Sequence, residues 1–291
     1  MSVKKMIINI SKNIGFCFGV NLAVSSVFKI ISSGKKCCTL GEVIHNPSVI
    51  EKFKNIGGVI VNDVKEVPKD YTLVIRSHGV ALSIFEEIKN LGISFLDATC
   101  PFVKKIHKIV NKYSKLGFTT LIAGDKNHCE VQGIIGNSLG TCYVFKNLKE
   151  LESILKEKNS DFYKVFVVAQ TTFSVEEWKK CCSLLKIKKP SYKIFDTICR
   201  STYLRQKEAD DISKKSDIMI VVGGNNSSNS LKLKDVCEKN CKTYFVEKYD
   251  DLKGVKFKGD EVVGLVSGAS VPMEDIIKIK KMLDNKIKGE E

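Results

Sequence analysis

Residues 93–101, Ile93-Ser94-Phe95-Leu96-Asp97-Ala98-Thr99-Cys100-Pro101, join a hydrophobic run to the start of an expected helix. The run that ends at Leu96 has the length and apolar character of a buried strand. Pro101 suits the first turn of a helix, where its missing N–H leaves no hydrogen bond unmade. The stretch therefore predicts a strand, a short loop ending at Cys100 and a helix, which together form one step of an α/β fold.

The same order recurs at two other cysteines. Residues 7–10 (Ile-Ile-Asn-Ile) precede Cys17, and residues 192–195 (Tyr-Lys-Ile-Phe) precede Asp196-Thr197-Ile198-Cys199. Three thiolates on separate loops can bind three irons of a cubane cluster and leave the fourth iron open to a substrate. The alternative is that these are buried structural cysteines, because a cysteine without a disulfide is among the most buried residue types.

Short β-branched runs alternate with polar loops and amphipathic segments along the chain, a pattern typical of helices around parallel sheets. Division at the cysteines predicts modules over 18–98, 99–197 and 198–281; we expect residues 1–17 to join the third module and residues 282–291 to form a tail. The expected strands are 73–75, 119–123, 164–169, 218–222 and 262–266, and the expected helices are 21–31, 102–115, 175–185, 205–215 and 272–284.

Composition indicates a globular protein of a reducing compartment. The chain has 291 residues, of which 43% are hydrophobic and 27% charged, which is ordinary for a folded protein. Its eleven cysteines are an odd number, and the N-terminus does not have the pattern of a secretory leader. We expect a cytoplasmic protein without a membrane partner, since no apolar run has the length of a membrane span.

The formal net charge is +14, but only three of the 47 basic residues are arginines, and the lysines are scattered along the chain. We interpret this as a solvated lysine-rich surface without a nucleic-acid partner. Such a surface can attract an acidic protein. A lysine-rich nucleic-acid-binding α/β protein is the alternative.

Three of the four histidines, His45, His78 and His128, stand just beyond expected strands. Ligand sites of open α/β sheets lie beyond the carboxyl ends of strands, so this placement predicts a polar site. Loop capping is the alternative for each histidine. His107 falls inside an expected helix and is interpreted as a packing or surface residue.

Two loops rich in glycine and serine are suited to an anion. Residues 223–230 (Gly-Gly-Asn-Asn-Ser-Ser-Asn-Ser) and residues 267–272 (Ser-Gly-Ala-Ser-Val-Pro) each lie between an expected strand and an expected helix start. Backbone N–H groups at a helix start, together with hydroxyl and amide groups, bind phosphate oxygens. Plain helix capping is the alternative. Neither loop has the glycine pattern of an ATP or NAD site.

Glu130 follows His128 by two residues, and we interpret it as a proton donor or acceptor. The same spacing occurs in zinc deaminases, but their later Pro-Cys-x-x-Cys segment is missing from this sequence. Gln170-Thr171-Thr172 places hydroxyl groups at the end of the expected strand 164–169.

Together these segments resemble the IspH/LytB family of 4-hydroxy-3-methylbut-2-enyl diphosphate reductases, in order and over almost the whole chain. The matching segments are Gly15-Phe16-Cys17-Phe18-Gly19-Val20, Glu42-Val43-Ile44-His45-Asn46, Ser77-His78-Gly79-Val80, Asp97-Ala98-Thr99-Cys100-Pro101, Gln170-Thr171-Thr172-Phe173-Ser174, Asp196-Thr197-Ile198-Cys199, Asn226-Ser227-Ser228-Asn229-Ser230 and Gly268-Ala269-Ser270. The resemblance implies three α/β modules with mostly parallel sheets, arranged as a trefoil around a central [4Fe-4S] cluster. It implies that Cys17, Cys100 and Cys199 hold this cluster and that its fourth iron is open.

The implied reaction is the last step of the non-mevalonate isoprenoid route. In it, (E)-4-hydroxy-3-methylbut-2-enyl diphosphate loses its hydroxyl in a two-electron reduction to isopentenyl diphosphate and dimethylallyl diphosphate. The family pattern implies that Glu130 is the proton source and that Thr171 orients the substrate hydroxyl. It implies substrate binding by His45, His78, His128, Thr171, Ser227, Ser228, Asn229 and Ser270. A ferredoxin or flavodoxin is the expected electron donor.

The sequence departs from the family pattern at two places. Cys129 stands where the family usually has proline, which adds an oxidisable thiol beside Glu130, and Arg200-Ser201 after Cys199 also differs from the commoner residues.

The other alternative is a non-enzymatic iron–sulfur protein in which a fourth ligand closes the cluster. That alternative would leave Glu130 and the anion-binding loops without a role.

Overall fold

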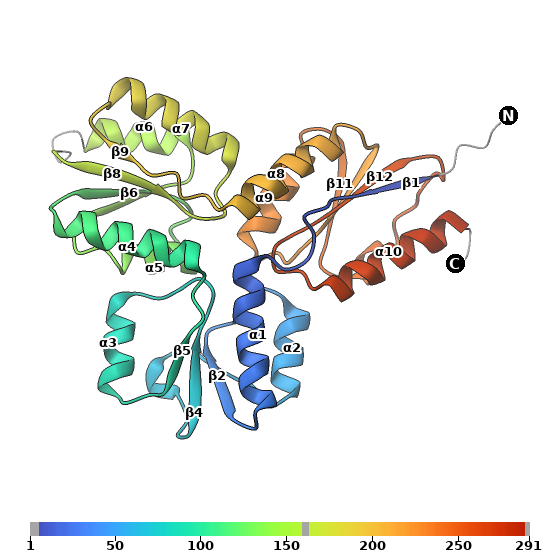
Figure 1. The fold of residues 1–291 in the computed structure, drawn as a ribbon. Helices are drawn as coiled ribbons and strands as arrows, with labels where there is room; N and C mark the ends of the chain where they lie inside the picture. Colours follow the sequence, from blue (N-terminus) through green and yellow to red (C-terminus); the bar gives the residue numbers. More distant parts are fainter. Residues whose placement is uncertain (1–5, 159–162, 289–291) are drawn as a thin grey trace. The chain divides into compact units, whose positions relative to one another are not determined.

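The computed structural model describes residues 6–158 and 163–288. Its strands form three four-stranded parallel sheets (Figure 1). The chain divides into two compact units, one of residues 1–17, 45–49 and 200–291 and the other of residues 18–44 and 50–199. Residues 1–5 of the predicted N-terminal segment and residues 289–291 of the predicted tail lie outside the described residues.

All three sheets have the same strand order. The first contains β2 (Lys36–Leu40), β3 (Val59–Val61), β4 (Tyr71–Ile75) and β5 (Phe95–Asp97) in the order β3-β2-β4-β5. The second contains β6 (Thr119–Ala123), β7 (Cys142–Phe145), β8 (Val165–Ala169) and β9 (Lys193–Ile194) in the order β7-β6-β8-β9. The third contains β10 (Ile218–Val222), β11 (Lys242–Val246), β12 (Val262–Ser267) and β1 (Ile7–Ile10) in the order β11-β10-β12-β1. The N-terminal strand β1 therefore takes the place in the third sheet that β5 and β9 take in the others.

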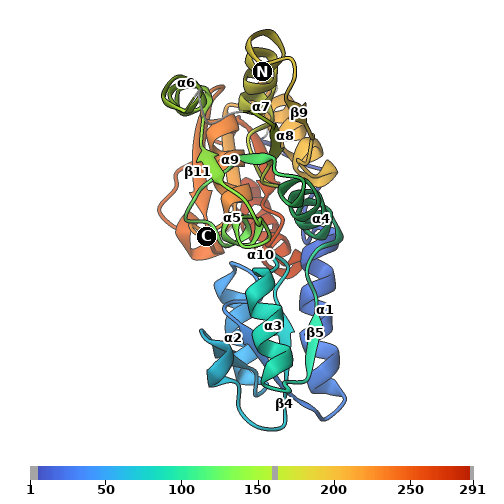
Figure 2. The ribbon, with the colours of Figure 1, turned by 90° about the vertical axis from the view of Figure 1, so that its left-hand side faces the viewer.

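Helices cover both faces of each sheet (Figure 1). Along the chain, α1 (Phe18–Ser32) precedes the strands of the first sheet, and α2 (Pro47–Asn55), η1 (Val64–Glu66) and α3 (Leu82–Asn90) lie between them. With the second sheet are α4 (Pro101–Lys115), α5 (Cys129–Ile135), α6 (Leu148–Glu157) and α7 (Val175–Lys188), and with the third are α8 (Arg200–Ser213), α9 (Ser228–Cys237), η3 (Tyr249–Leu252) and α10 (Met273–Lys288). Figures 1 and 2 show α1 and α3 on opposite sides of β4 and β5.

The alternation of side chains along each strand divides the core into two layers. In β10, Ile220 and Val222 pack with Ile279 of α10 on one face. Met219 and Val221 pack with Leu233 of α9 on the other face. Parallel strands buried on both faces need near-continuous apolar runs, which is why these short β-branched segments form the central strands.

The predicted α/β fold with parallel sheets is confirmed, and the strands predicted over 119–123 and 218–222 have those bounds. The predicted start of the helix over 205–215 is wrong, because α8 runs from Arg200 to Ser213. Ser201 and Thr202 have weak helix propensity, but burial of Thr202 within the fold favours the helical conformation. The module boundaries at 98, 197 and 281 stay a prediction.

Within the described ranges, none of the helices has both the length and the apolar character that crossing a bilayer requires.

Candidate active site

The three cysteines occupy equivalent positions in the three sheets. Cys100 follows β5, Cys199 follows β9 and Cys17 follows β1, so each comes after the edge strand in the fourth place. In every case the cysteine N–H donates to a carbonyl two residues beyond the neighbouring strand: Ser77 O for Cys100 (3.0 Å), Thr171 O for Cys199 (3.1 Å) and Ala269 O for Cys17 (3.1 Å). This repeated hydrogen bond holds each cysteine at the carboxyl end of its sheet.

A helix begins directly after each cysteine. The first turns of these helices, residues 18–21, 101–104 and 200–203, carry only neutral and basic side chains. The partial positive charge of a helix start therefore has no acidic neighbour in that turn. A helix start of this kind stabilises an anionic group bound there.

Glycine is required where α1 passes Cys100. A Cβ added to Gly19 would lie 2.5 Å from Cys100 Sγ and 2.9 Å from Cys100 Cβ. Cys100 is the N-cap residue of α4, and its side chain makes no capping hydrogen bond. Its sulfur is therefore not used to satisfy the helix start.

Glu130 and Thr171 form a buried pair at the carboxyl end of the second sheet. Thr171 N donates to Glu130 Oε1 at 2.6 Å, and Thr171 Oγ1 donates to Glu130 Oε2 at 2.7 Å. Because Thr171 O also accepts from Cys199 N, one residue contacts both the carboxylate and the backbone of a candidate metal ligand. The sequence named both members of this pair, and the structure brings them together.

Burial determines the protonation of Glu130. Glu130 is 2% exposed, and this desolvation raises the pKa of its carboxyl group from 4.5 to about 7 despite the two hydrogen bonds from Thr171, which lower it. The side chain can therefore hold or release a proton near neutral pH, as a general acid must.

The side chains of His78 and His128 lie next to each other in the second unit. Their ring centroids are 5.5 Å apart in an edge-to-face arrangement. His128 is the N-cap residue of α5, and its Nδ1 accepts from Glu130 N at 3.1 Å. The capping role proposed as an alternative for the histidines is thus real for His128, and it fixes the ring next to the buried glutamate.

His107 supports the turn that carries His78. Gly79 has a φ of +70°, which glycine adopts without strain, and a Cβ there would lie 2.6 Å from His107 Cε1. Burial lowers the pKa of His107 to about 4, so its ring is neutral. This agrees with the interpretation of His107 as a packing residue.

Cys129 Sγ lies 4.0 Å from His128 Nδ1. Burial raises the pKa of this thiol, although the positive charge of Arg76 opposes the effect. The departure from the family pattern therefore introduces a protonated thiol that is less reactive than an exposed cysteine.

Hydroxyl and amide groups gather at the carboxyl end of the third sheet. Ser227 is the N-cap residue of α9, and its Oγ accepts from Ser230 N at 3.4 Å and from Ser230 Oγ at 3.0 Å. Ser270 Oγ lies 3.5 Å from Ser227 Oγ. Asn229 is 4% exposed, and its Nδ2 has no hydrogen-bond partner among the described residues. A buried donor of this kind needs an acceptor, and a phosphate oxygen would supply it.

The other predicted binding residues of this unit lie along the same loops. Ser228 is the first residue of α9 and is half-buried. A Cβ added to Gly224 would lie 3.1 Å from His45 O, so the backbone of His45 contacts the glycine loop before α9. The first unit thus contains Cys17, His45, Ser227, Ser228, Asn229 and Ser270, and the second contains Cys100, Cys199, His78, His128, Glu130 and Thr171.

Sequence reasoning missed the role of Arg205. This buried side chain donates from Nη2 to Gly15 O at 2.7 Å and from Nη1 to Ser267 O at 2.8 Å. It therefore joins the loop before Cys17 to the end of β12. Its place among only three arginines in a lysine-rich chain was the available signal, since arginine is preferred where two donors must be fixed in a buried site.

The interpretation of the other cysteines as structural agrees with their environment. Burial raises the pKa values of Cys37, Cys181 and Cys237 to about 12 and those of Cys38 and Cys182 to about 11. All eleven cysteines lie among the described residues, and none of them forms a disulfide.

The fold and site define an α/β protein of three parallel sheets with one cysteine fixed at the carboxyl end of each sheet. A profile of the LytB protein family matches residues 8–284. The chain belongs to the LytB family.

Curated relatives and solved structures agree with this assignment. A protein of Caldanaerobacter subterraneus subsp. tengcongensis named 4-hydroxy-3-methylbut-2-enyl diphosphate reductase is 38% identical over 286 residues, which cover 95% of this chain and 98% of that protein. A Thermoanaerobacter protein (strain X514) of the same name is 39% identical, with 98% and 99% covered.

Two solved structures are similar over almost the whole chain. The E-1-hydroxy-2-methyl-but-2-enyl-4-diphosphate reductase from Plasmodium falciparum has a TM-score of 0.89 at 29% identity, with 97% of this chain and 89% of that chain covered. A second structure, described as (E)-4-hydroxy-3-methyl-but-2-enyl diphosphate reductase, the terminal enzyme of the non-mevalonate pathway, has a TM-score of 0.67 at 33% identity, with 96% and 100% covered.

Proposed function

We propose that this chain reduces (E)-4-hydroxy-3-methylbut-2-enyl diphosphate to isopentenyl diphosphate and dimethylallyl diphosphate. The C–O bond of the allylic hydroxyl breaks, a C–H bond forms, two electrons and two protons are consumed and water leaves. The observation that carries this proposal is the equivalent placement of Cys17, Cys100 and Cys199, each hydrogen-bonded in the same way at the end of a sheet. The names of the relatives point to the same reaction.

The chemistry of the three cysteines fits a [4Fe-4S] cluster with one iron open. Thiolate is the usual protein ligand of such clusters, and the first helical turns after Cys17, Cys100 and Cys199 contain no acidic side chain that would repel an anionic cluster. We propose these three residues as the ligands. When bound, the cluster supplies the electrons and a Lewis-acidic iron for the substrate hydroxyl.

The diphosphate is the part of the substrate that the polar loops recognise. Asn229 Nδ2 and the Ser227 and Ser270 hydroxyls supply neutral donors at the start of α9, where the helix dipole also favours negative charge. Among the remaining predicted ligands, His45, His78 and His128 add imidazole donors and Ser228 a further helix-start hydroxyl. Binding the diphosphate group in this way fixes the position of the hydroxyl group at the other end of the substrate.

Glu130 supplies a proton, and Thr171 positions the substrate hydroxyl. Burial raises the pKa of the carboxyl group to about 7, so a substantial fraction of it is protonated at neutral pH. Thr171 Oγ1, 2.7 Å from Glu130 Oε2, is placed to exchange a proton between the carboxyl group and a hydroxyl bound next to it. The two residues therefore act as one hydrogen-bonded unit.

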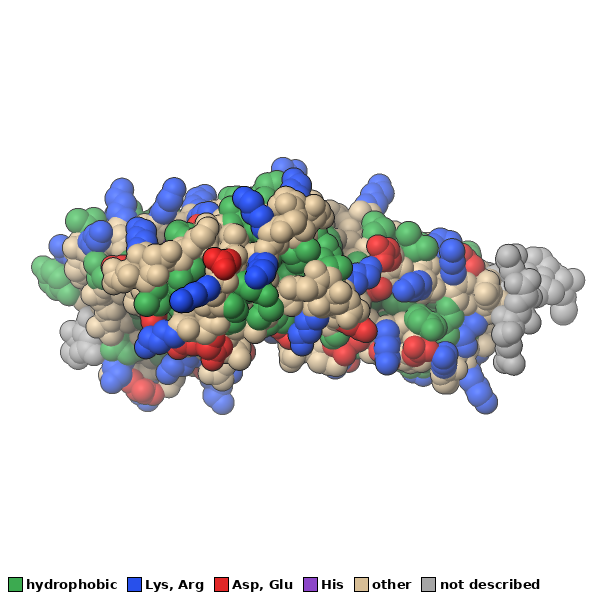
Figure 3. Space-filling model, turned by 90° about the horizontal axis from the view of Figure 1, so that it is seen from below, with side chains coloured by type: hydrophobic (Ala, Val, Ile, Leu, Met, Phe, Trp, Pro, Cys, Tyr) green, Lys and Arg blue, Asp and Glu red, His purple; other side chains and the backbone are tan. Residues whose placement is uncertain are grey.

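A ferredoxin or flavodoxin is the proposed electron donor. On the face shown in Figure 3, lysines and arginines are scattered among acidic, polar and hydrophobic side chains. This distribution is suited to a weak attraction for an acidic protein. A nucleic-acid-binding surface would need the basic side chains in a continuous stripe.

The test is turnover of the allylic diphosphate by anaerobically purified protein, with a reduced viologen as the electron source. We expect wild-type protein to release both products, and Glu130→Gln to bind the same amount of iron but to lose activity by about two orders of magnitude or more. A wild-type protein that contains the cluster but leaves the substrate unchanged would favour the electron-carrier alternative.

A further inference from the structure

Exposed apolar side chains stand at the start of the two helices that meet at Cys100. Phe18, the first residue of α1, is 66% exposed, and Phe102, in the first turn of α4, is 46% exposed. Leu22 lies one turn after Phe18 on the same face of α1 and is also exposed. Phe18, Leu22 and Phe102 are called the Cys100 patch below.

We propose that the Cys100 patch is the docking surface for the protein that delivers the electrons. The partner is an acidic iron–sulfur or flavin electron carrier. This inference rests on the proposed function, since it assumes that Cys100 is a ligand of the cluster that receives the electrons. It adds the place on the molecule at which the carrier binds.

The patch lies within one helical turn of the Cys100 sulfur. Gly19 directly follows Phe18 in α1. A Cβ added to Gly19 would lie only 2.5 Å from Cys100 Sγ. Phe102 follows Cys100 by two residues. A protein seated on these side chains therefore approaches the candidate ligand more closely than one bound at the far ends of α1 and α4, since a helix lengthens by about 1.5 Å for each residue.

The composition of the two helices fits an acidic partner with an apolar centre. α4 contains five lysines and no acidic residue, and Lys105 and Lys108 are exposed near the patch. The first turn of α1 is likewise without an acidic side chain. Transient electron-transfer complexes use small interfaces, in which an apolar centre gives contact and a charged rim gives orientation and a fast encounter.

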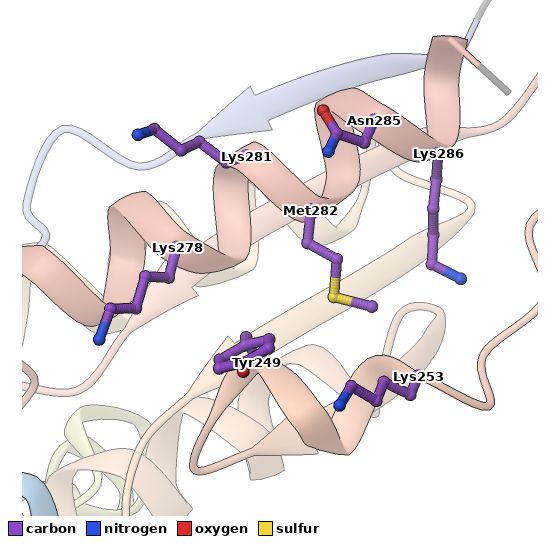
Figure 4. A pocket seen from close by; sticks show the side chains of 7 residues that line it. All are labelled: Tyr249, Lys253, Lys278, Lys281, Met282, Asn285 and Lys286. Atoms are coloured by element: carbon purple, nitrogen blue, oxygen red, sulfur yellow. The ribbon is translucent and has the colours of Figure 1, made fainter. Parts of the chain in front are cut away.

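A basic groove in the other unit is the rival surface. The groove has a volume of about 690 Å³ and is lined by Tyr249, Lys253, Lys278, Lys281, Met282, Asn285 and Lys286 (Figure 4). Two of its four lysines are engaged within the protein, because Lys253 pairs with Asp250 and Lys286 Nζ donates to Val255 O. The first residue of α10 that lines the groove is Lys278, five residues after Met273, where the helix begins.

The experiment compares two electron sources in the same variants. Phe18→Ser, Phe102→Ser and Leu22→Ser remove apolar contact from the patch, and Ile187→Ser is the matched control because Ile187 is a more exposed apolar residue of the same unit. With reduced ferredoxin as donor, we expect each of the two phenylalanine variants to raise KM for ferredoxin by about ten-fold, the effect of losing one central interface contact. Turnover with reduced viologen should not change, and Ile187→Ser should behave as wild type.

A second pair of variants separates the patch from the groove. Lys105→Glu with Lys108→Glu should weaken ferredoxin-driven turnover, whereas Lys278→Glu with Lys281→Glu should leave it unchanged. The opposite result, or phenylalanine variants with an unaltered KM for ferredoxin, would overturn the proposal.

Binding of oxidised ferredoxin, measured by calorimetry, gives the same comparison without turnover. If wild-type protein binds ferredoxin through the patch but does not convert the substrate with viologen, the proposed function fails and the docking surface stands. If viologen-driven turnover is normal and the patch variants bind ferredoxin as tightly as wild type, the docking surface fails and the proposed function stands.

Discussion

At the scale of single residues, Glu130 shows how burial decides a chemical role. Two hydrogen bonds from Thr171 favour its charged form, yet loss of solvent outweighs them and raises its pKa to about 7. An exposed glutamate, with a pKa near 4.5, would be ionised at pH 7 and could not serve as an acid there. The protein matrix around Glu130 therefore favours the proton-donor role that we propose for it.

The raised pKa predicts how activity depends on pH. Turnover driven by a viologen reductant should fall as the pH rises through about 7, because the protonated fraction of Glu130 decreases there. The residual turnover of Glu130→Gln should lack this decline. Steady-state rates between pH 6 and pH 9, measured with saturating substrate, make the comparison; a wild-type rate that stays constant across this range would contradict the role given to Glu130.

Gly19 provides a second test at this scale. We expect Gly19→Ala to lower the iron content of the protein, because the new Cβ would lie 2.5 Å from Cys100 Sγ and the thiol must move. Gly254→Ala is the control, since a Cβ there meets no atom within 4 Å among the described residues. Iron analysis of both variants after anaerobic purification checks this; equal iron in Gly19→Ala and wild type would mean that the Cys100 sulfur is not held in place for a metal.

At the scale of elements, each sheet places the same kinds of group after the same strands. The loops after β2, β6 and β10 carry His45, His128 and Ser227. The loops after β4, β8 and β12 carry His78, Thr171 and Ser270. The edge strands β5, β9 and β1 lead to Cys100, Cys199 and Cys17. Neighbouring strands whose connections run to opposite sides leave a crevice at their carboxyl ends. The polar groups that follow the two central strands of each sheet flank that crevice.

The start of α9 allows a direct test of diphosphate binding. Asn229→Ala removes a buried donor that has no partner among the described residues, so the substrate should lose one hydrogen bond to a charged oxygen. Such a bond is worth about 1.5–3 kcal/mol, which corresponds to at least a ten-fold weaker binding of the diphosphate. Asn226→Ala, an exposed neighbour in the same loop, is the control.

Calorimetry with inorganic pyrophosphate as the probe measures this effect without turnover. Equal affinities of wild type and Asn229→Ala would show that the amide does not contact the diphosphate.

The central strands, and the positions of the candidate site residues just after them, were predictable from the sequence because both depend on local patterns. Strands such as β6 and β10 are short β-branched runs bounded by polar loops, and the site residues follow them directly. The resemblance to a known family supplied the role proposed for Thr171 and agreed with the proton-transfer role interpreted for Glu130; both roles stay predictions. What the sequence could not predict were contacts between distant segments, such as Arg205 with Gly15, or the start of α8, where tertiary burial overrides weak helix propensity.

At the scale of the whole molecule, the net charge of +14 affects how the chain meets its partners. Charges spread over a surface speed the encounter with an oppositely charged protein, and salt screens this attraction. We expect ferredoxin-driven turnover to slow severalfold as ionic strength rises from about 0.05 M to about 0.5 M. The maximal rate at saturating ferredoxin should change much less. A KM for ferredoxin that does not depend on salt would mean that the lysines take no part in recognition.

The central claim is that three thiolates hold an iron–sulfur cluster and leave one iron to the substrate. Mössbauer spectroscopy of the anaerobic, iron-57-labelled protein, recorded with and without the allylic diphosphate, tests it most directly. The account predicts about four irons in one cluster, with the signal of a single iron changing when the substrate is added. A protein without iron, or a cluster whose irons all keep their signals in the presence of substrate, would contradict it.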